Sequence, residues 1–186
     1  VRGNADEAIK NSKYVVTRKY KTPWQEHGFM EPECCVALPE NEDGLLIYTT
    51  CQSVYDVQRE CSTMLKIAPE KVHVHSPLVG GGFGGKEDMS VQQYAALMAW
   101  YTKKPVKIKY TRQESLDYHV KRHPMEMEFT TACDENGHLT AMKGVIIADT
   151  GAYASLGGPV LHRACTHAAG PYNYQNIDIF GMSVYT

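Results

Sequence analysis

The chain contains 186 residues, of which 43% are hydrophobic and 22% are charged, as in ordinary soluble globular domains. Its formal net charge of −2 offers no electrostatic attraction for nucleic acid or for an anionic membrane surface. No apolar run approaches the roughly 18 residues that a transmembrane helix needs, and no basic-then-apolar leader indicates secretion. The six cysteines form no CxxC pair, so we expect reduced thiols in a cytoplasmic protein.

The first part of the chain predicts a strand followed by a hairpin. Residues 14–20 show strand-like alternation, which predicts a strand. Residues 33–38 and 45–50 have a similar pattern and flank a turn that ends in Asp43-Gly44. An Asp-Gly pair tolerates the positive φ angles of tight turns, so these two segments are predicted to pair.

The middle of the chain predicts two helices and two further strands. Ser53 and Asp56 have the spacing of a helix start, and the residues after them keep helical periodicity. Residues 71–79 alternate again, as a strand does. Residues 87–102 predict a helix that is apolar around most of its circumference, and such a helix is expected to be buried. A short strand is predicted over residues 106–110.

The last part of the chain predicts a helix start, a second hairpin and an irregular tail. Thr111 and Glu114 have the spacing of a capping box. Residues 125–133 and 138–148 flank an Asp-Glu-Asn-Gly turn and are expected to pair. Residues 153–175 are rich in glycine, alanine and histidine, and we predict no regular structure there. The predicted fold class is α+β, a mixed sheet with hairpins and packed helices.

The segment with the strongest chemical signal is a glycine loop over residues 80–85, in which five of six residues are glycine. Glycines let a backbone approach a ligand closely and leave several N–H groups free to bind an anion. The loop follows a predicted strand and precedes a predicted helix, whose N-terminus favours negative charge. A ligand that carries a phosphate is therefore one interpretation, and a turn needed only for tight packing is another.

The two standard nucleotide motifs fail at the residues that carry their chemistry. Gly80, Gly82 and Gly85 satisfy the dinucleotide pattern G-x-G-x-x-G, but the next predicted strand ends without the acidic residue that holds a ribose. Lys86 completes most of a P-loop. The next position of a P-loop should be Ser or Thr, to bind magnesium, and here it is Glu87, which would repel the phosphates.

The run GGGFGGKE at residues 80–87 resembles the molybdenum hydroxylases, specifically the xanthine dehydrogenase family. Further landmarks of that family occur in the same order along the chain. They are QEH at residues 25–27, RHP at residues 122–124, and a later segment that begins at Arg163. The resemblance implies that residues 1–186 are a single compact fragment, part of the molybdopterin-binding domain of a larger subunit.

The resemblance also implies which residues hold the cofactor. Gln25 would donate a hydrogen bond to an oxo ligand of the molybdenum centre. Gly82, Phe83 and Gly84 would hold the pterin and metal end of the cofactor, with Phe83 as an apolar wall. No side chain of this chain is expected to bind the metal directly.

The same resemblance assigns catalytic roles to Glu87 and Arg163. Glu87 would hydrogen-bond a ring nitrogen of the substrate, and Arg163 would stabilise negative charge that develops on the heterocycle. One acid and one guanidinium suit a purine or a similar N-heterocycle better than an aldehyde. Without the resemblance, Glu87 could equally charge the first turn of the predicted helix, and Arg163 could be a surface residue of a loop.

The resemblance implies an oxidoreductase that takes its oxygen from water and holds molybdopterin, or its cytosine dinucleotide form. Electrons would pass to 2Fe–2S and FAD groups on other domains or subunits, in an oligomer. The family's catalytic base lies further along the polypeptide, so we expect the isolated 186-residue chain to be inactive. Two alternatives remain, a cofactor-free assembly or interaction domain and a phosphate- or nucleotide-binding module.

Overall fold

The computed structural model describes all residues from 1 to 186. Contacts divide the chain into two compact units, and each is described by itself. The terminal unit combines the two ends of the chain, Val1–Gln25 and His123–Thr186, and the central unit is Glu26–Arg122. The sequence predicted residues 1–186 as one compact fragment, and the boundary between the two units lies inside it. No glycine- or proline-rich linker in the sequence marks this boundary.

The terminal unit is a four-stranded sheet with two helices. Its strands lie in the order β1-β6-β7-β8; β6 pairs antiparallel with both β1 and β7, and β7 runs parallel to β8. The elements are α1 (Ala5–Lys10), β1 (Tyr14–Thr22), β6 (Met125–Cys133), β7 (Leu139–Asp149), α5 (Gly157–His167) and β8 (Asn176–Val184). The predicted strand at residues 14–20 and the predicted hairpin of β6 and β7 are confirmed.

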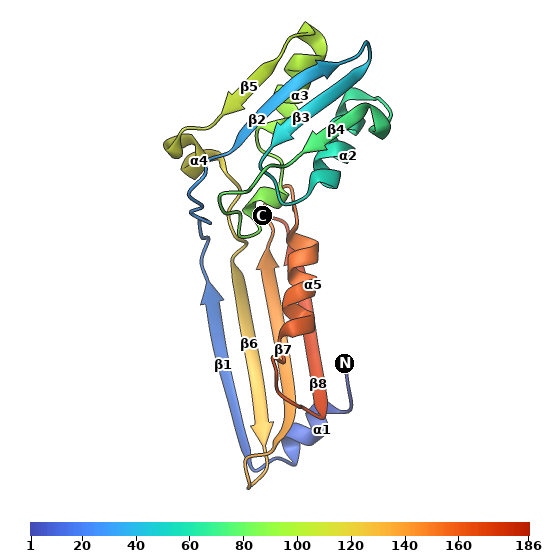
Figure 1. The fold of residues 1–186 in the computed structure, drawn as a ribbon. Helices are drawn as coiled ribbons and strands as arrows, with labels where there is room; N and C mark the ends of the chain where they lie inside the picture. Colours follow the sequence, from blue (N-terminus) through green and yellow to red (C-terminus); the bar gives the residue numbers. More distant parts are fainter. The chain divides into compact units, whose positions relative to one another are not determined.

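Helix α5 contradicts the prediction that residues 153–175 are irregular. It connects the parallel strands β7 and β8 and packs along them (Figure 1). Its start, Gly-Gly-Pro, is typical of a loop, but proline fits the first turn of a helix because no N–H is needed there. The helix can pack closely because Gly181 of β8 has no side chain: a Cβ there would lie 2.4 Å from the sulfur of Cys165.

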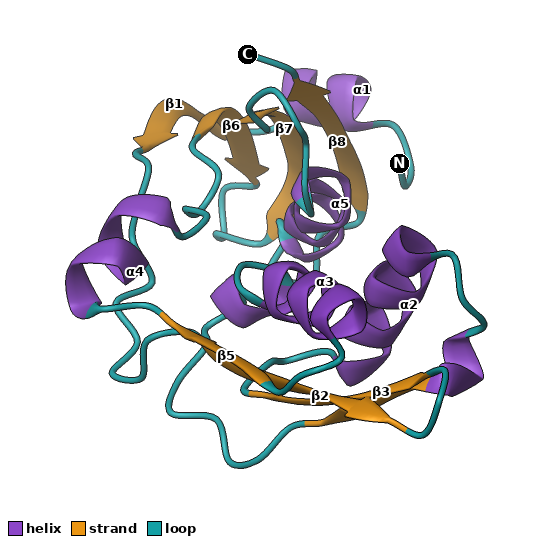
Figure 2. Ribbon diagram, turned by 90° about the horizontal axis from the view of Figure 1, so that it is seen from above, coloured by secondary structure: helices purple, strands orange, loops and turns teal.

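The central unit is a second four-stranded sheet with helices on one face (Figure 2). Its strands lie in the order β4-β3-β2-β5, with β3 and β4 parallel and the other pairs antiparallel. The elements are β2 (Cys34–Glu40), β3 (Gly44–Thr49), α2 (Val54–Leu65), the 3-10 turn η1 (Pro69–Lys71), β4 (Val72–His75), the 3-10 turn η2 (Gly85–Glu87), α3 (Gln92–Thr102), β5 (Val106–Lys109) and α4 (Arg112–Tyr118). The predicted α+β class with a mixed sheet, hairpins and packed helices is confirmed, although the strands form two mixed sheets rather than one.

Helix α3 differs from its prediction in where it begins and how it packs. It begins at Gln92 rather than at residue 87, because Asp88 has an extended backbone (φ −75°, ψ 152°) that no helix can contain. Only one face of α3 is buried, and small residues such as Ala95 and Ala99 form it. The large side chains of Met98 and Tyr101 point outward, so the expectation of a fully buried helix is wrong.

Local signals at turns and caps explain why most other elements follow the sequence. The capping box at Thr111 and Glu114 is present and begins α4. The hairpin of β2 and β3 forms as predicted, although Asn41 rather than Gly44 adopts the positive φ.

All six cysteines are free thiols, and burial raises the pKa of Cys35 to about 12. None of the helices combines the length and apolar character needed to span a bilayer.

Candidate functional site

The glycine loop lies in the central unit, between β4 and α3, and bends through several left-handed backbone positions. Gly81 and Gly84 have φ angles of +92° and +89°, which side chains strongly disfavour. Phe83 between them also has a positive φ, of 54°, and such a conformation is uncommon for a bulky residue. This strained bend is what five glycines in six positions make possible.

Two side chains from other parts of the central unit hold the loop in place. The amide oxygen of Gln52 accepts hydrogen bonds from the backbone N–H of Gly84 (2.9 Å) and of Lys86 (3.1 Å). The carboxylate of Glu31 accepts from the backbone N–H of Gly80 and from Nζ of Lys86, both at 2.8 Å. These contacts fix both ends of the loop, and the side chain of Gln52 also lies directly against the backbone of Gly82.

The apex of the loop presents unused hydrogen-bond donors. The backbone N–H groups of Gly81, Gly82 and Phe83 have no acceptor within the chain. A Cβ added at Gly84 would meet no atom within 4 Å, so the backbone there faces open space. Phe83 is 74% exposed. Three free donors, an open glycine and an exposed ring fit a cofactor that carries both oxygen acceptors and a flat ring system.

Lys86 is unavailable to an incoming anion. Its side chain is 1% exposed, its ammonium is paired with Glu31, and it lies 4.6 Å from the centre of the Phe29 ring. Burial alone would raise the pKa of Glu31, but the hydrogen bonds from Lys86 and Gly80 outweigh it and hold that pKa below its usual value. The lysine therefore works as an internal anchor, which counts against the P-loop alternative.

The predicted substrate residue Glu87 ends the η2 turn that follows the loop. Its carboxylate is exposed and has no hydrogen-bond or ion-pair partner within the chain. Because α3 begins only at Gln92, Glu87 does not charge the first turn of that helix. An exposed and unpaired acid directly after the glycine loop is free to contact a ligand.

The remaining predicted residues belong to the terminal unit. Gln25 is exposed at the end of that unit's first segment, and its side chain makes no hydrogen bond within the chain. Arg163 lies on α5 rather than in a loop; it is exposed, and its guanidinium pairs with no acidic side chain. The structure thus gathers Gly82, Phe83 and Gly84 with Glu87 on one segment of the central unit.

The sequence did not reveal the residues that support the loop. Gln52 is a single glutamine before α2, and nothing in its surroundings distinguishes it from a surface residue. Glu31 stands out in the sequence only as a neighbour of the QEH segment. His119, at the end of α4, is 5% exposed and lies beneath the loop. Only tertiary contacts, at separations of 32 residues or more, give these side chains a role.

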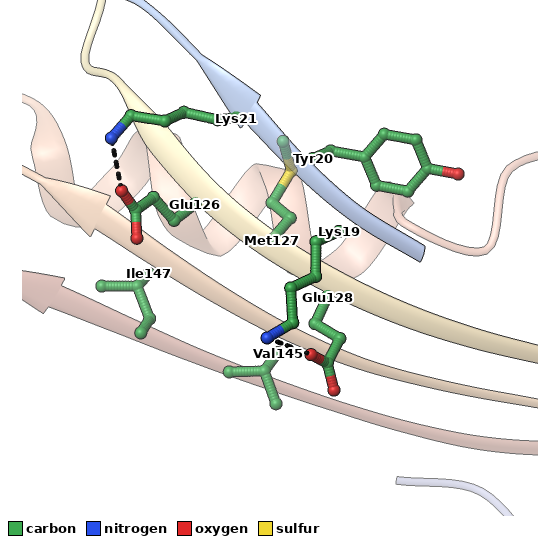
Figure 3. Close-up of a pocket in the computed structure, with 8 residues that line it drawn as sticks. All are labelled: Lys19, Tyr20, Lys21, Glu126, Met127, Glu128, Val145 and Ile147. Carbon is green, nitrogen blue, oxygen red and sulfur yellow. Dashed lines mark hydrogen bonds and ion pairs between the residues drawn. The ribbon is translucent and has the colours of Figure 1, made fainter. Parts of the chain in front are cut away.

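A groove of about 520 Å³ on the terminal unit contains none of the predicted residues (Figure 3). It lies on the β1, β6 and β7 strands, and its apolar part includes Val145 and Ile147. Its four charged residues neutralise one another: Lys19 pairs with Glu128 (3.3 Å) and Lys21 with Glu126 (2.6 Å). The groove therefore offers no free acid, base or cation for chemistry.

Comparison with known proteins identifies relatives over the whole chain. Residues 1–186 match the family described as the molybdopterin cofactor-binding domain. The chain is 42% identical over 184 residues to a probable xanthine dehydrogenase component of Bacillus subtilis, covering 99% of this chain and 25% of that protein. It is 40% identical over 184 residues to the nicotinate dehydrogenase large molybdopterin subunit of Eubacterium barkeri, covering 99% of this chain and 43% of that protein.

Solved structures agree on the fold. The aldehyde oxidoreductase of Desulfovibrio gigas superposes with a TM-score of 0.92 at 24% identity, covering all of this chain and 20% of that one. The quinoline 2-oxidoreductase of Pseudomonas putida 86 superposes with a TM-score of 0.87, also at 24% identity, covering all of this chain and 24% of that one. The chain spans between about a fifth and less than half of each of these proteins.

Proposed function

Because this chain belongs to the family of molybdopterin cofactor-binding domains, we propose that it is part of a molybdenum hydroxylase that oxidises a purine or a similar nitrogen heterocycle. The observation that carries the proposal is the glycine loop, where three free N–H groups are followed directly by the unpaired carboxylate of Glu87. The oxidation itself, with oxygen taken from water, is the chemistry that the molybdenum cofactor supplies when it is bound.

Four residues are proposed to hold the cofactor. Gly82, Phe83 and Gly84 form the apex of the glycine loop. The N–H groups of Gly82 and Phe83 have no acceptor within the chain, and the backbone of Gly84 faces open space, which suits the pterin and its oxygen atoms. The exposed ring of Phe83 offers an apolar surface. Gln25 has a free amide side chain that can donate a hydrogen bond to an oxo ligand.

Two residues are proposed to select the substrate. The carboxylate of Glu87 can accept a hydrogen bond from a ring N–H, or donate one when it is protonated. The guanidinium of Arg163 can stabilise negative charge on an exocyclic oxygen of the ring. The names of two relatives, a xanthine and a nicotinate dehydrogenase, refer to flat nitrogen heterocycles that carry oxygen, and this supports the substrate class.

The whole protein is proposed to be an oligomeric assembly that acts in the cytoplasm. Its 2Fe–2S and FAD groups would lie on other domains or subunits and carry electrons away from the molybdenum. We expect the 186-residue chain alone to be inactive and to represent part of the cofactor-binding domain, because the chain spans 25% of one relative and 43% of another.

The first experiment is to measure molybdenum and released pterin in the intact protein from its own host. Metal and pterin close to one per subunit are expected, followed by turnover of hypoxanthine or xanthine in a heterocycle screen. Protein without metal and pterin, prepared under conditions that preserve related enzymes, would favour a cofactor-free interaction domain. Metal-loaded protein that oxidises only aldehydes would retain the cofactor assignment and exclude the substrate class.

Glu87→Gln and Arg163→Met test the substrate residues within the loaded enzyme. Each should lower kcat/KM on a purine by at least about 100-fold, the size usual for a lost group that stabilises transition-state charge, while the molybdenum content stays near that of the wild type. Lys19→Met, in the groove of the terminal unit, is the control and should change neither quantity. Equal losses on purines and on aldehydes would remove Arg163 from its electrostatic role.

A further inference from the structure

Three aromatic side chains form a floor beneath the glycine loop within the central unit. The rings of His27 and His119 meet edge to face with centroids 5.4 Å apart, and Phe29 meets His119 in the same way at 4.9 Å. Phe29 is 1% exposed and His119 is 5% exposed. None of these rings belongs to the residues proposed to touch the cofactor or the substrate.

The loop contacts this floor most closely at Gly85. A Cβ at Gly85 would lie 2.5 Å from Nε2 of His119 and 2.9 Å from Nδ1 of His27, distances that no side chain can tolerate. Gly85 also closes the bend, because its N–H donates to the carbonyl of Gly82 at 2.8 Å. The position of the His119 ring therefore decides how deep Gly85, and with it the apex of the loop, can lie.

Glu33 lies beside His119 in an arrangement that does little for stability. Nδ1 of His119 is 2.7 Å from Oε1 of Glu33, and the two side chains are 1% and 3% exposed. Both carboxylate oxygens and both ring nitrogens nevertheless lack a hydrogen bond with proper geometry. Burying polar groups without hydrogen bonds costs free energy, so a contribution to folding does not account for this pair.

The charges around His119 come from three segments. Glu33 and Glu26 favour a proton on the ring, whereas His27 and Lys121 oppose it; Lys121 is itself paired with Glu26 at 2.6 Å. Burial is the largest influence and lowers the pKa of His119 below its usual value. The lowered pKa favours the neutral imidazole, which can lie directly under the uncharged backbone of Gly85.

Building on the proposed function, we propose that His119 is a positioning residue: held beside Glu33, its ring supports Gly85 and sets the height of the three free N–H groups that receive the cofactor. His119 touches neither cofactor nor substrate in this arrangement. Its removal would let the loop sink or fluctuate, and the donors at Gly81, Gly82 and Phe83 would lose their alignment.

Four variants of the intact enzyme test this positioning. His119→Ala removes the support and should lower molybdenum occupancy or kcat by about tenfold or more, as is usual for groups that orient a cofactor site indirectly. Gly85→Ala should cause a similar loss, because its methyl group collides with the imidazole. In the double variant Gly85→Ala/His119→Ala, the loss of occupancy or kcat should be smaller than the product of the two single losses, because the methyl group enters the space that the ring leaves.

A fourth variant, Glu33→Gln/His119→Phe, keeps a ring under Gly85 and replaces both ionisable side chains of the buried pair. It should recover most of the molybdenum occupancy that His119→Ala loses. Such a recovery would show that the loss in His119→Ala does not come from general destabilisation of the fold. His73→Ala is the matched control, since His73 also contacts a glutamate, Glu40, but at an exposed site on β4. It should leave the occupancy and kcat unchanged.

Hydrogen exchange provides a readout that does not require cofactor. The peptide that contains residues 80–87 should exchange faster in His119→Ala than in the wild type, while peptides of α2 and β3 stay unchanged. Unchanged exchange with full occupancy in His119→Ala, or losses that simply multiply in the double variant, would overturn the positioning role. Wild-type protein that lacks molybdenum would instead overturn the proposed function. In that case the hydrogen exchange of residues 80–87 in His119→Ala would still test the positioning role by itself.

Discussion

The two units each contain lysine–glutamate pairs with similar distances but different surroundings. In the terminal unit, Lys21 and Glu126 approach to 2.6 Å across neighbouring strands, and both side chains are more than half exposed. In the central unit, Lys86 and Glu31 approach to 2.8 Å, and the lysine side chain is 1% exposed. The same chemistry is a screened surface contact in one place and a buried anchor of the glycine loop in the other.

The two pairs lie in different kinds of backbone: a regular sheet in the terminal unit and the strained glycine loop in the central unit. The antiparallel strands of the terminal unit satisfy their backbone groups through ladder hydrogen bonds and need no help from side chains. The glycine loop has no such ladder, so Gln52 and Glu31 supply acceptors for its N–H groups. Mutation should therefore have its largest effects in the glycine loop and at the side chains that replace its missing backbone partners.

Gly84→Val is expected to have the largest effect. The φ angle of Gly84 is +89°, and a β-branched residue cannot adopt it without strain. Its side chain would also project into the open space proposed for the cofactor. Molybdenum and pterin should be absent from the purified variant, whereas Gly137→Val, at an exposed hairpin turn of the terminal unit with a similar φ, should remain loaded. Full occupancy of Gly84→Val would contradict the role of the loop apex.

Glu31→Ala should be the most destabilising change to the buried pair. It leaves the ammonium of Lys86 buried without its partner, and breaking such a pair typically costs about 3 kcal/mol. The free energy of unfolding, measured with denaturant, should fall by that order. Glu128→Ala removes an exposed partner of Lys19 and should leave the unfolding free energy unchanged within error. Equal effects of the two changes would refute the contrast between the units.

Acid should weaken the central unit in two stages. Burial lowers the pKa of His119, so the unfolded chain binds a proton more readily than the folded one. Stability should therefore decrease as pH falls below the usual histidine pKa of about 6.5. The lowered pKa values of Glu26 and Glu31 imply a further loss as pH falls below the usual glutamate value of about 4.3.

Unfolding measured between pH 7.5 and pH 5.5 isolates the first stage. The variant Glu33→Gln/His119→Phe has no imidazole at this position and should show a smaller decrease over that interval than the wild type. The second stage should be unaffected by the change. An identical decrease in both proteins would assign the first stage to other histidines.

The prediction of the fold succeeded where the signals are local. Alternation of apolar residues identified β1, and turn residues placed both hairpins. The prediction failed for α5, whose Gly-Gly-Pro start is typical of loops, because the helix is stabilised by packing on Gly181 rather than by its own propensity. It also began α3 too early, since the helical periodicity of the sequence continues through Asp88, whose backbone is extended.

By itself, the sequence determined the family of this protein and singled out the glycine loop as the segment proposed to bind its ligand. Five glycines in six positions imply a strained, close-approaching backbone, and the order of the motifs identified the molybdopterin-binding family. Only the tertiary structure decided which donors of the loop stay free and which are already used. Gln52, Glu31 and His119 reach the loop across 32 or more residues of sequence, and local patterns carry no information about such contacts, because packing alone brings these side chains together.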